Sequence, residues 1–423
     1  MSIVPTAESI KQGWWVDRKV YFSEEVFQLE RERIFAKTWH FACLVTDVKN
    51  PGDFFSMSVI NQPILIVRDG EGQLGAFFNS CTHRGAMLTH ERSGNCGRLF
   101  RCMYHAWAFS LKGELLGVPY VDAYGPDFDR KDFALHSVRC ETFCNLVFVT
   151  LNPKAPPLID YLGEIADVLS TYATGIEVIA RNSWVYDGNW KLWHENFRDN
   201  YHPQFAHRGI NDATPHYADR GGNWALAPGH SLLRWISEKP NVTSYKRSMK
   251  RYSGVEFPEA GNPSLTGGNW EYREAPQDVL AIFPNMDMQP GMASTEPGQR
   301  GSRMGHIQTL TPLSPHRTRV DYIAYSSTDD DPVTRQAMLE GLAENQGSWG
   351  KISCDDVEAA VRCHAGVQAQ GTQYTPFTRG IKPGKGGADV DPRDEYSLRE
   401  FYRVYTQYLE GDVVSEASIA RNS

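Results

Sequence analysis

Two short stretches, Cys81-Thr82-His83 and Cys102-Met103-Tyr104-His105, contain the residues that decide how this chain folds. Each stretch pairs a cysteine with a histidine, with one residue between them in the first and two in the second, and 18 residues separate the two pairs. Each pair can offer one thiolate and one imidazole. Both pairs follow short apolar runs, so we expect them on loops at strand ends, where a rigid sheet holds ligands in place.

Two mixed Cys/His pairs fit a Rieske centre, a [2Fe–2S] cluster in which two cysteines bind one iron and two histidines bind the other. Imidazoles in place of thiolates raise the reduction potential, which suits a centre that receives electrons and passes them on. Zinc is the alternative, because Cys₂His₂ also forms tetrahedral zinc sites. The usual finger has its two cysteines in one half and its two histidines in the other. Here each half is mixed and Trp107 can screen a cluster from water, so the pattern favours the Rieske centre.

The bulk composition indicates a globular protein with more than one domain. The chain has 423 residues, of which 41% are hydrophobic and 12% aromatic, enough for a sizeable core. A net charge of −8 disfavours a role with nucleic acid or an anionic membrane. We expect no transmembrane helix and no signal peptide, and a cytoplasmic location. We also expect six cysteines to be buried free thiols: Cys43, Cys96, Cys140, Cys144, Cys354 and Cys363.

The order of elements predicts three parts. Residues 1–38 form an N-terminal helical segment, in which Ser23 is the N-cap of a helix over 24–36. Residues 39–152 alternate short apolar runs with turn residues and predict an all-β domain. After the proline-rich boundary at 152–157, residues 153–423 mix strands and helices without the alternation of βαβ units. This pattern predicts an α+β domain with helices packed on an antiparallel sheet.

Within this last part we expect particular elements. The strands span 183–186, 279–283, 305–311 and 319–326, and the helices span 158–173, 332–346, 355–368 and 398–410. Surface loops are expected at 258–269 and 381–391, where Gly, Pro and polar residues gather.

A second chemical motif spans residues 195–207, with the sequence Glu-Asn-Phe-Arg-Asp-Asn-Tyr-His-Pro-Gln-Phe-Ala-His. His202 and His207 are five residues apart, a poor spacing for one face of a regular helix. Pro203 follows His202 directly, so we expect a helix break that lets both imidazoles converge on one ion. Two histidines and one carboxylate form the facial triad of non-haem Fe(II) oxygenases. The alternative is two ordinary histidines.

The third ligand must be a carboxylate, and the residues alone leave its identity open. Asp199 lies three residues before His202 and can hydrogen-bond to it. The pair Asp355-Asp356 is the later candidate. Helix capping is an equally good interpretation of that pair, since Ser353 with Asp356 resembles a capping box and acidic residues favour a helix start.

Together these motifs resemble the large (α) subunit of Rieske non-haem iron aromatic-ring-hydroxylating oxygenases, and the likeness covers nearly the whole chain. It includes the Cys81 pair with Arg84-Gly85 after it, the Cys102 pair with Trp107, the strand that ends at Pro153, the Asp199 to His207 motif and Asp355-Asp356. One departure is Ser80, where many relatives have arginine. Ser80 lies outside the ligand set.

The resemblance implies a fold and a ligand set. It implies an all-β Rieske [2Fe–2S] domain over 39–152 and a helix-grip-like catalytic mononuclear iron domain over 153–423, on which residues 1–38 pack. The cluster ligands would be Cys81, His83, Cys102 and His105, and the iron ligands His202, His207 and Asp356. Asp199 would bridge His202 to the His105 of a neighbouring subunit, which implies a trimer.

The resemblance also implies an activity. Electrons from NAD(P)H would arrive through a reductase and a ferredoxin, O₂ would be the co-substrate, and a small β subunit would complete an α₃β₃ assembly. The chain is most similar to the salicylate 5-hydroxylase type, which converts salicylate into gentisate. The alternative is a dioxygenase of benzoate, anthranilate or terephthalate. The candidate pocket residues are Asn196, Phe197, Met288, His306, Gln308, Gln346 and Ile352.

Two other classes of protein compete with an oxygenase. A pure electron carrier would need only the cluster domain, so the second histidine motif argues against it. A non-catalytic scaffold subunit is disfavoured because all seven ligand positions hold ligand residues.

Overall fold

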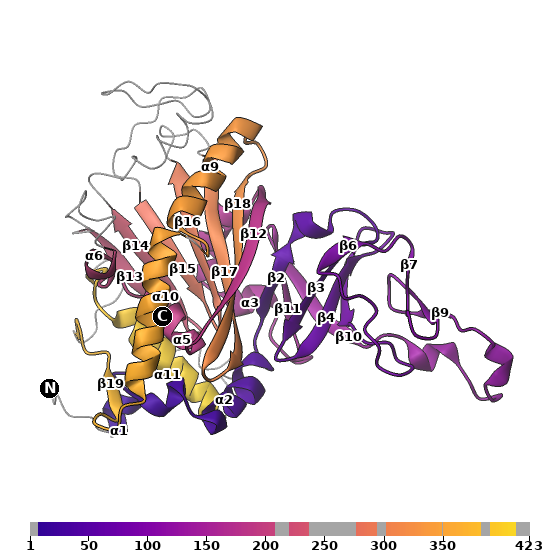
Figure 1. Cartoon of the computed structure of the whole chain (residues 1–423), viewed down its shortest axis with the longest axis horizontal. Helices are drawn as coiled ribbons and strands as arrows, with labels where there is room; N and C mark the ends of the chain where they lie inside the picture. The colour runs from indigo at the N-terminus through magenta and orange to yellow at the C-terminus, as the bar shows by residue number, and fades with distance from the viewer. Residues whose placement is uncertain are drawn as a thin grey trace. The chain divides into compact units, whose positions relative to one another are not determined.

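The structure is a computed structural model that describes residues 7–207, 220–236, 276–293, 302–348, 350–381 and 390–411. The chain forms two compact units, labelled by element in Figure 1. The smaller unit runs from Phe35 to Tyr161, whereas the predicted all-β domain spans 39–152. The larger unit combines the residues up to Ile34 with those from Leu162 onward.

The smaller unit is all-β, which confirms its predicted class. A seven-stranded antiparallel sheet has the order β2-β11-β10-β5-β4-β3-β6, and a three-stranded sheet has the order β7-β8-β9. Successive residues of β4 point into two different cores, Ile64 and Ile66 into one, Leu65 and Val67 into the other. This two-sided burial explains the unbroken apolar run. The strands are β2 His40–Leu44, β3 Asp53–Val59, β4 Gln62–Arg68, β5 Leu74–Phe78, β6 Ser93–Asn95, β7 Leu99–Arg101, β8 Ala108–Ser110, β9 Leu115–Gly117, β10 Ser137–Phe143 and β11 Leu146–Thr150.

The larger unit is built on a seven-stranded antiparallel sheet of order β12-β18-β17-β16-β15-β14-β13. Helices pack on this sheet, so the predicted α+β class is confirmed. The strands are β12 Ile176–Tyr186, β13 Arg220–Leu226, β14 His230–Ile236, β15 Pro276–Ile282, β16 Met286–Ala293, β17 Ser302–Ser314 and β18 Arg317–Ser327, and a separate pair joins β1 Trp15–Asp17 to β19 Tyr374–Pro376. The helices are α1 Ala7–Lys11, α2 Glu24–Glu30, α4 Ile165–Ala173, α5 Trp190–Asn196, α6 Pro203–Ala206, α9 Pro332–Asn345, α10 Lys351–Val367 and α11 Tyr396–Glu410, and the short helix α3, Leu158–Leu162, precedes α4.

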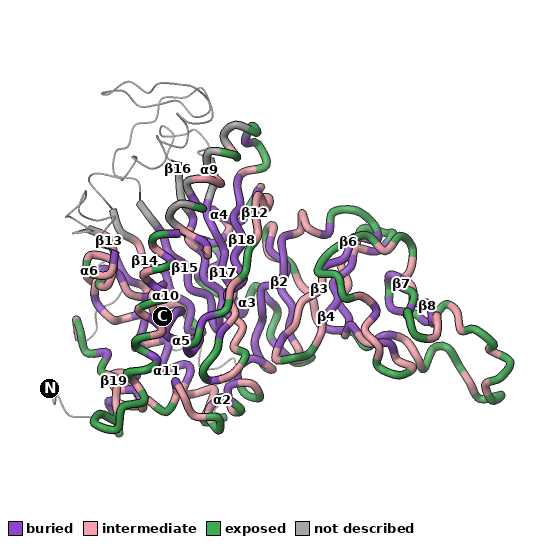
Figure 2. The backbone as a smooth tube through the Cα atoms, in the orientation of Figure 1, coloured by how far each residue is buried: buried purple, intermediate pink, exposed green. Residues whose placement is uncertain are grey.

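One face of the larger sheet is covered by helices α5, α9 and α10. Helix α5 contacts β17, α9 contacts β12 and β18, and α10 contacts α5 and α9. The Trp193 indole N–H donates a hydrogen bond of 2.8 Å to the Gln308 side-chain oxygen, which fixes α5 on the sheet. Figure 2 shows the central strands of this sheet as mostly buried.

Two predicted helices differ from the structure at their ends or middle. Ser23 caps α2 as predicted, because its hydroxyl accepts a hydrogen bond from the Val26 N–H at 3.3 Å. The α-helix ends at Glu30 and continues as a π-helical turn over Arg31–Phe35. The expected helix over 158–173 is interrupted at Gly163, whose φ of +51° is disfavoured for other residues. The predicted loop at 258–269, and most of that at 381–391, lie outside the described residues.

The cysteines are all free thiols, but three of them correct the expectation of burial. Cys144, Cys354 and Cys363 are exposed, while Cys43 is buried and Cys96 and Cys140 are half-buried. Cys144 lies in the tight turn between β10 and β11, and Cys354 and Cys363 lie on exposed positions of α10. Among the described residues, none of the helices combines the length and the apolar character needed to cross a bilayer.

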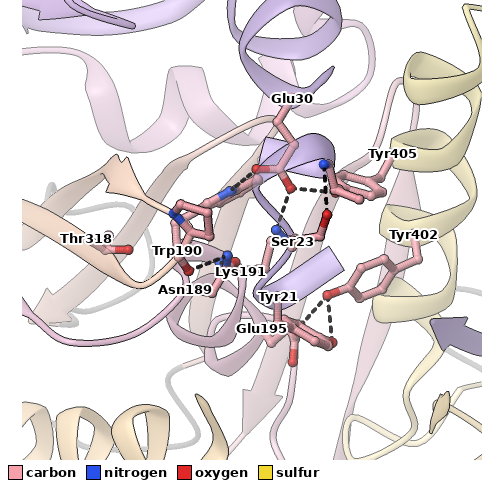
Figure 3. Close-up of polar contacts among 12 residues, drawn as sticks. Tyr21, Ser23, Glu30, Asn189, Trp190, Lys191, Glu195, Thr318, Tyr402 and Tyr405 are labelled. Carbon is pink, nitrogen blue, oxygen red and sulfur yellow. Dashed lines mark hydrogen bonds and ion pairs between the residues drawn. The ribbon is translucent and has the colours of Figure 1, made fainter. Parts of the chain in front are cut away.

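A buried ion pair ties the N-terminal segment to α5. Figure 3 shows the Glu30 carboxylate between Lys191 and two ring donors. The Lys191 ammonium lies 2.5 Å from Glu30 Oε1, Tyr405 donates to the same oxygen at 2.5 Å, and Trp190 donates to Oε2 at 3.0 Å. Both charged side chains are almost fully buried. Each charge therefore depends on the other to offset its desolvation.

We predict that Lys191→Met destabilises the larger unit by about 3–5 kcal/mol, because it leaves Glu30 buried without its cation. Thermal unfolding of the purified protein measures the effect as a lower Tm. The control is Arg362→Met, which removes an exposed partner of Glu358 on α10 and costs at most about 0.5 kcal/mol. Equal Tm values for the two variants would show that the buried pair contributes nothing.

Candidate metal centres

The two Cys/His loops of the smaller unit are built in the same way. Cys81 follows β5 and Cys102 follows β7. In each loop the cysteine carbonyl accepts a hydrogen bond from the N–H four residues on, at 2.8 Å from Gly85 and 3.0 Å from Ala106. The Cys81 N–H donates to the Ala86 carbonyl oxygen and the Cys102 N–H donates to the Trp107 carbonyl oxygen, both at 2.8 Å. Gly85 and Ala106 both have positive φ, so the two loops share one turn despite their different Cys–His spacing.

The two cysteine side chains interact with each other, and the two histidine rings are in contact. Cys81 and Cys102 are buried, and the rings of His83 and His105 are 4.6 Å apart. His83 Nδ1 is buried and has no hydrogen-bond partner, as expected of an atom that binds a metal. Burial raises the pKa of the Cys81 thiol, so its thiolate needs a bound cation. Trp107 stacks on His83 at 4.7 Å and screens the site.

A helix break is present in this motif, but it lies earlier than the break predicted at Pro203. Helix α5 ends at Asn196, and α6 begins at Pro203 with His202 as the residue before it. His202 and His207 therefore stand at opposite ends of a single helical turn. Their ring centroids are 5.4 Å apart, so this short turn, which Pro203 begins, brings both imidazoles together.

Asp356 of α10 completes this group. Its Oδ1 lies 3.6 Å from His202 Nε2 and 3.3 Å from His207 Nε2. One ligand atom from each residue lies within 4.8 Å of the others. Asp356 Oδ1 is buried without a hydrogen bond, and burial raises the pKa of this carboxyl. A bound cation offsets both costs, so the three residues fit a facial metal site.

The capping interpretation of Asp355-Asp356 is wrong. Helix α10 begins at Lys351 with Gly350 as its N-cap, so both aspartates lie in the second turn. The Ser353 hydroxyl has no hydrogen-bond partner, which excludes a capping box there. The sequence placed the helix start four residues too late, because the acidic pair imitates an N-terminal signal.

In both His202 and His207, the Nε2 atom faces Asp356 and the Nδ1 atom lies beside a second carboxylate. His202 Nδ1 lies 3.2 Å from Asp199 Oδ2, and His207 Nδ1 lies 3.2 Å from Asp355 Oδ2. Burial alone would lower the pKa of His202, but the hydrogen bond and charge of Asp199 raise it above its ordinary value. The i,i+3 spacing predicted the contact between Asp199 and His202. No local pattern predicted the contact of Asp355, whose partner is 148 residues away.

A cavity opens at these residues. Four predicted pocket residues line it, Asn196, Phe197, Gln346 and Ile352, and sequence analysis missed Asn200, Pro203, Leu233, Val279 and Gln289. Of the missed residues, Leu233 and Gln289 belong to β14 and β16, strands that the sequence did not predict. The described part of the wall contains four carboxamides and the carboxylates of Asp199 and Asp356, and neither lysine nor arginine.

Three predicted pocket residues do not belong to this wall. Met288 points to the opposite face of β16, because side chains alternate along a strand and its neighbour Gln289 faces the cavity. His306 pairs with Gln289 across the strands and lies against Phe197, with ring centroids 6.3 Å apart. Burial lowers the pKa of His306 to about 3, so this imidazole is neutral. Gln308 is buried under Trp193.

Family models match both parts of the chain. The Rieske [2Fe-2S] domain model matches residues 38–139, and the model of the ring-hydroxylating alpha subunit catalytic domain matches residues 174–411. The chain belongs to the family of ring-hydroxylating alpha subunits. It therefore carries a Rieske cluster and a mononuclear iron as an oxidoreductase, and both the zinc and the electron-carrier alternatives are set aside.

Relatives agree over nearly the whole length. The large subunit of anthranilate 1,2-dioxygenase from Burkholderia cepacia is 36% identical, over 87% of this chain and 88% of that one. The alpha subunit of 2-aminobenzenesulfonate 2,3-dioxygenase from Alcaligenes sp. is 28% identical, over 95% of each chain. Naphthalene 1,2-dioxygenase from Rhodococcus sp. has the same fold, with a TM-score of 0.80, 24% identity, and coverage of 96% of this chain and 97% of that one.

We predict that Asp356→Ala lowers the iron content from three to two atoms per chain, because the metal loses its carboxylate while the cluster ligands stay intact. Metal analysis and the visible spectrum of the cluster measure the two sites separately. Glu358→Ala, on an exposed position of the same helix, is the control and should keep three. Full iron content in Asp356→Ala would contradict the assignment.

Proposed function

We propose that this chain is the large subunit of a terminal oxygenase that hydroxylates an aromatic acid, and specifically one that converts salicylate into gentisate. The observation that carries the proposal is the meeting of His202, His207 and Asp356 at a cavity whose described wall is rich in carboxamides. Its alternative is a dioxygenase of benzoate, anthranilate or terephthalate, since the same triad serves both reactions.

The cavity wall favours a polar aromatic substrate over a hydrocarbon. Leu233, Val279 and Ile352 offer apolar surface that can hold a ring and exclude water. The carboxamides of Asn196, Asn200, Gln289 and Gln346 can donate hydrogen bonds to a carboxylate, which accepts them through two oxygens. Two relatives described above are named for ring substrates with an acidic group, anthranilate and 2-aminobenzenesulfonate.

In our proposal, each group of residues has a separate role. Cys81, His83, Cys102 and His105 hold the cluster, and His202, His207 and Asp356 hold the iron. When bound, the cluster supplies single electrons and the iron supplies the activation of O₂. Asp199 orients the His202 ring through Nδ1 and offers a route for an electron and a proton from a neighbouring subunit's cluster.

The partners are proposed from the family. Relatives are named as alpha or large subunits, which supports a small β subunit in an α₃β₃ assembly. A ferredoxin and a reductase would deliver electrons from NAD(P)H. The trimeric arrangement and the cytoplasmic location stay predictions.

The proposal is tested by reductase-dependent O₂ uptake on salicylate, benzoate, anthranilate, terephthalate and naphthalene, with analysis of the products. Gentisate from salicylate would support 5-hydroxylation. A cis-dihydrodiol or a catechol from another acid would select the dioxygenase alternative. Turnover of naphthalene alone, with every acid inert, would overturn the aromatic-acid proposal.

We predict that Asp199→Asn retains three irons per chain and a normal cluster spectrum, but loses turnover by about 100-fold, the upper end of the range for such a partner. The amide keeps the shape of the side chain and removes its charge from the His202 contact. Single-turnover oxidation of the reduced cluster, with substrate and O₂ present, measures the step directly. Wild-type kinetics in this variant would exclude Asp199 from the electron route.

A further inference from the structure

Two consecutive residues of α10 hold the His207 imidazole from both sides. Asp356 Oδ1 lies 3.3 Å from Nε2, on the side of the proposed iron. Asp355 Oδ2 lies 3.2 Å from Nδ1, on the opposite side of the ring. Successive residues of a helix are turned by about 100° from each other, so one helix can place a carboxylate at each nitrogen.

This contact fixes the state of the ring as well as its orientation. A carboxylate at Nδ1 accepts a hydrogen bond, so the proton stays on Nδ1 and the Nε2 lone pair is free for a metal. His207 itself is nearly fully buried, and the backbone N–H of His207 donates to Pro203 at 3.1 Å. Without Asp355, the described residues offer Nδ1 no other acceptor within hydrogen-bond distance.

The two outer carboxylates are placed differently. Asp199 belongs to the same short segment as its histidine, three residues before it, and its other oxygen accepts the Tyr201 N–H at 2.6 Å. Asp355 comes from a different element and is adjacent in the chain to a proposed iron ligand. Any movement of α10 therefore moves Asp355 and Asp356 together against His207.

We propose that Asp355 is a positioning residue that sets the affinity of the mononuclear site for iron, while Asp199 serves the transfer of electrons. The inference rests on the proposed ligand set. The contacts of Asp199 with His202 and of Asp355 with His207 have the same length, but we assign a different function to each. Loss of Asp355 should weaken metal binding and leave electron transfer intact once the metal is bound.

The experiment compares Asp355→Ala, Asp355→Asn and Asp199→Asn in the full-length chain with its partner proteins. Fe(II) is removed with a chelator, and the dissociation constant is measured by titration with Fe(II) alone. We expect Asp355→Ala to raise this constant about 10- to 100-fold, the range found when an outer partner of a metal-bound histidine is removed. Asp355→Asn should fall between it and the wild type, because the amide oxygen still accepts a hydrogen bond.

The second measurement is turnover at saturating Fe(II). Asp355→Ala should recover most of the wild-type rate there, whereas Asp199→Asn should stay inactive even when it is saturated with Fe(II). Glu358→Ala, one turn further along α10 and paired with exposed Arg362, is the matched control with unchanged affinity. Alanine at 355 is compatible with a helix and the Asp355 side chain is 43% exposed, so folding should be preserved.

Two results would overturn the inference while leaving the proposed function in place. One is wild-type Fe(II) affinity in Asp355→Ala when Asp356→Ala has lost the metal. The other is normal affinity in Asp355→Ala with a loss of turnover that saturating Fe(II) does not restore. If Asp356→Ala also binds Fe(II) normally, the ligand set is wrong and the inference is overturned together with it.

Discussion

The convergence of His202 and His207 on Asp356 depends on one constraint, the fixed position of helix α5. The segment that carries both histidines contains only one helical turn of its own, and α5 directly precedes it. Trp193 is hydrogen-bonded to β17, and Lys191 is paired with Glu30 of the N-terminal segment. These contacts hold the helix from the sheet and from the N-terminal segment. The end of α5 at Asn196 therefore has a fixed position, and the segment with both histidines follows from it.

A buried arginine extends this support to the residue before Asp199. The Arg198 guanidinium is fully buried, with Nη2 3.0 Å from both His194 Nε2 and the Gly229 carbonyl oxygen, and it lies over the Phe401 ring. Burial lowers the pKa of His194, so its neutral ring can accept from Arg198 while its Nδ1 lies 2.7 Å from Asp287 Oδ1. Such a network costs desolvation energy. These contacts restrict the backbone next to Asp199. The Asp199 carboxylate is thereby held beside His202 Nδ1.

The sequence predicted the fold class and the two cofactors, but not the details of the cavity wall. Cysteine, histidine and aspartate ligands are limited to a few residue types at defined spacings, so the two Cys/His pairs and the His202–His207 spacing were informative. Local sequence signals also predicted structure correctly where neighbouring residues determine it, as with Ser23 at the start of α2. They failed where a residue contacts a distant part of the chain. The acidic pair at 355–356 looked like a helix start, and instead its two carboxylates face a histidine from another element.

The cavity wall was the least predictable part because it depends on strand register. Gln289 and Met288 are neighbours, yet only Gln289 faces the cavity, and a shift of one residue would exchange them. Strands β14 and β16 were not predicted from the sequence, so their cavity-lining residues Leu233 and Gln289 were missed. An enzyme named for naphthalene and one named for anthranilate share this fold or family. The shared fold therefore does not by itself determine the substrate. Our proposal assigns substrate selection to the cavity wall, where Asn196, Asn200, Gln289 and Gln346 supply carboxamides.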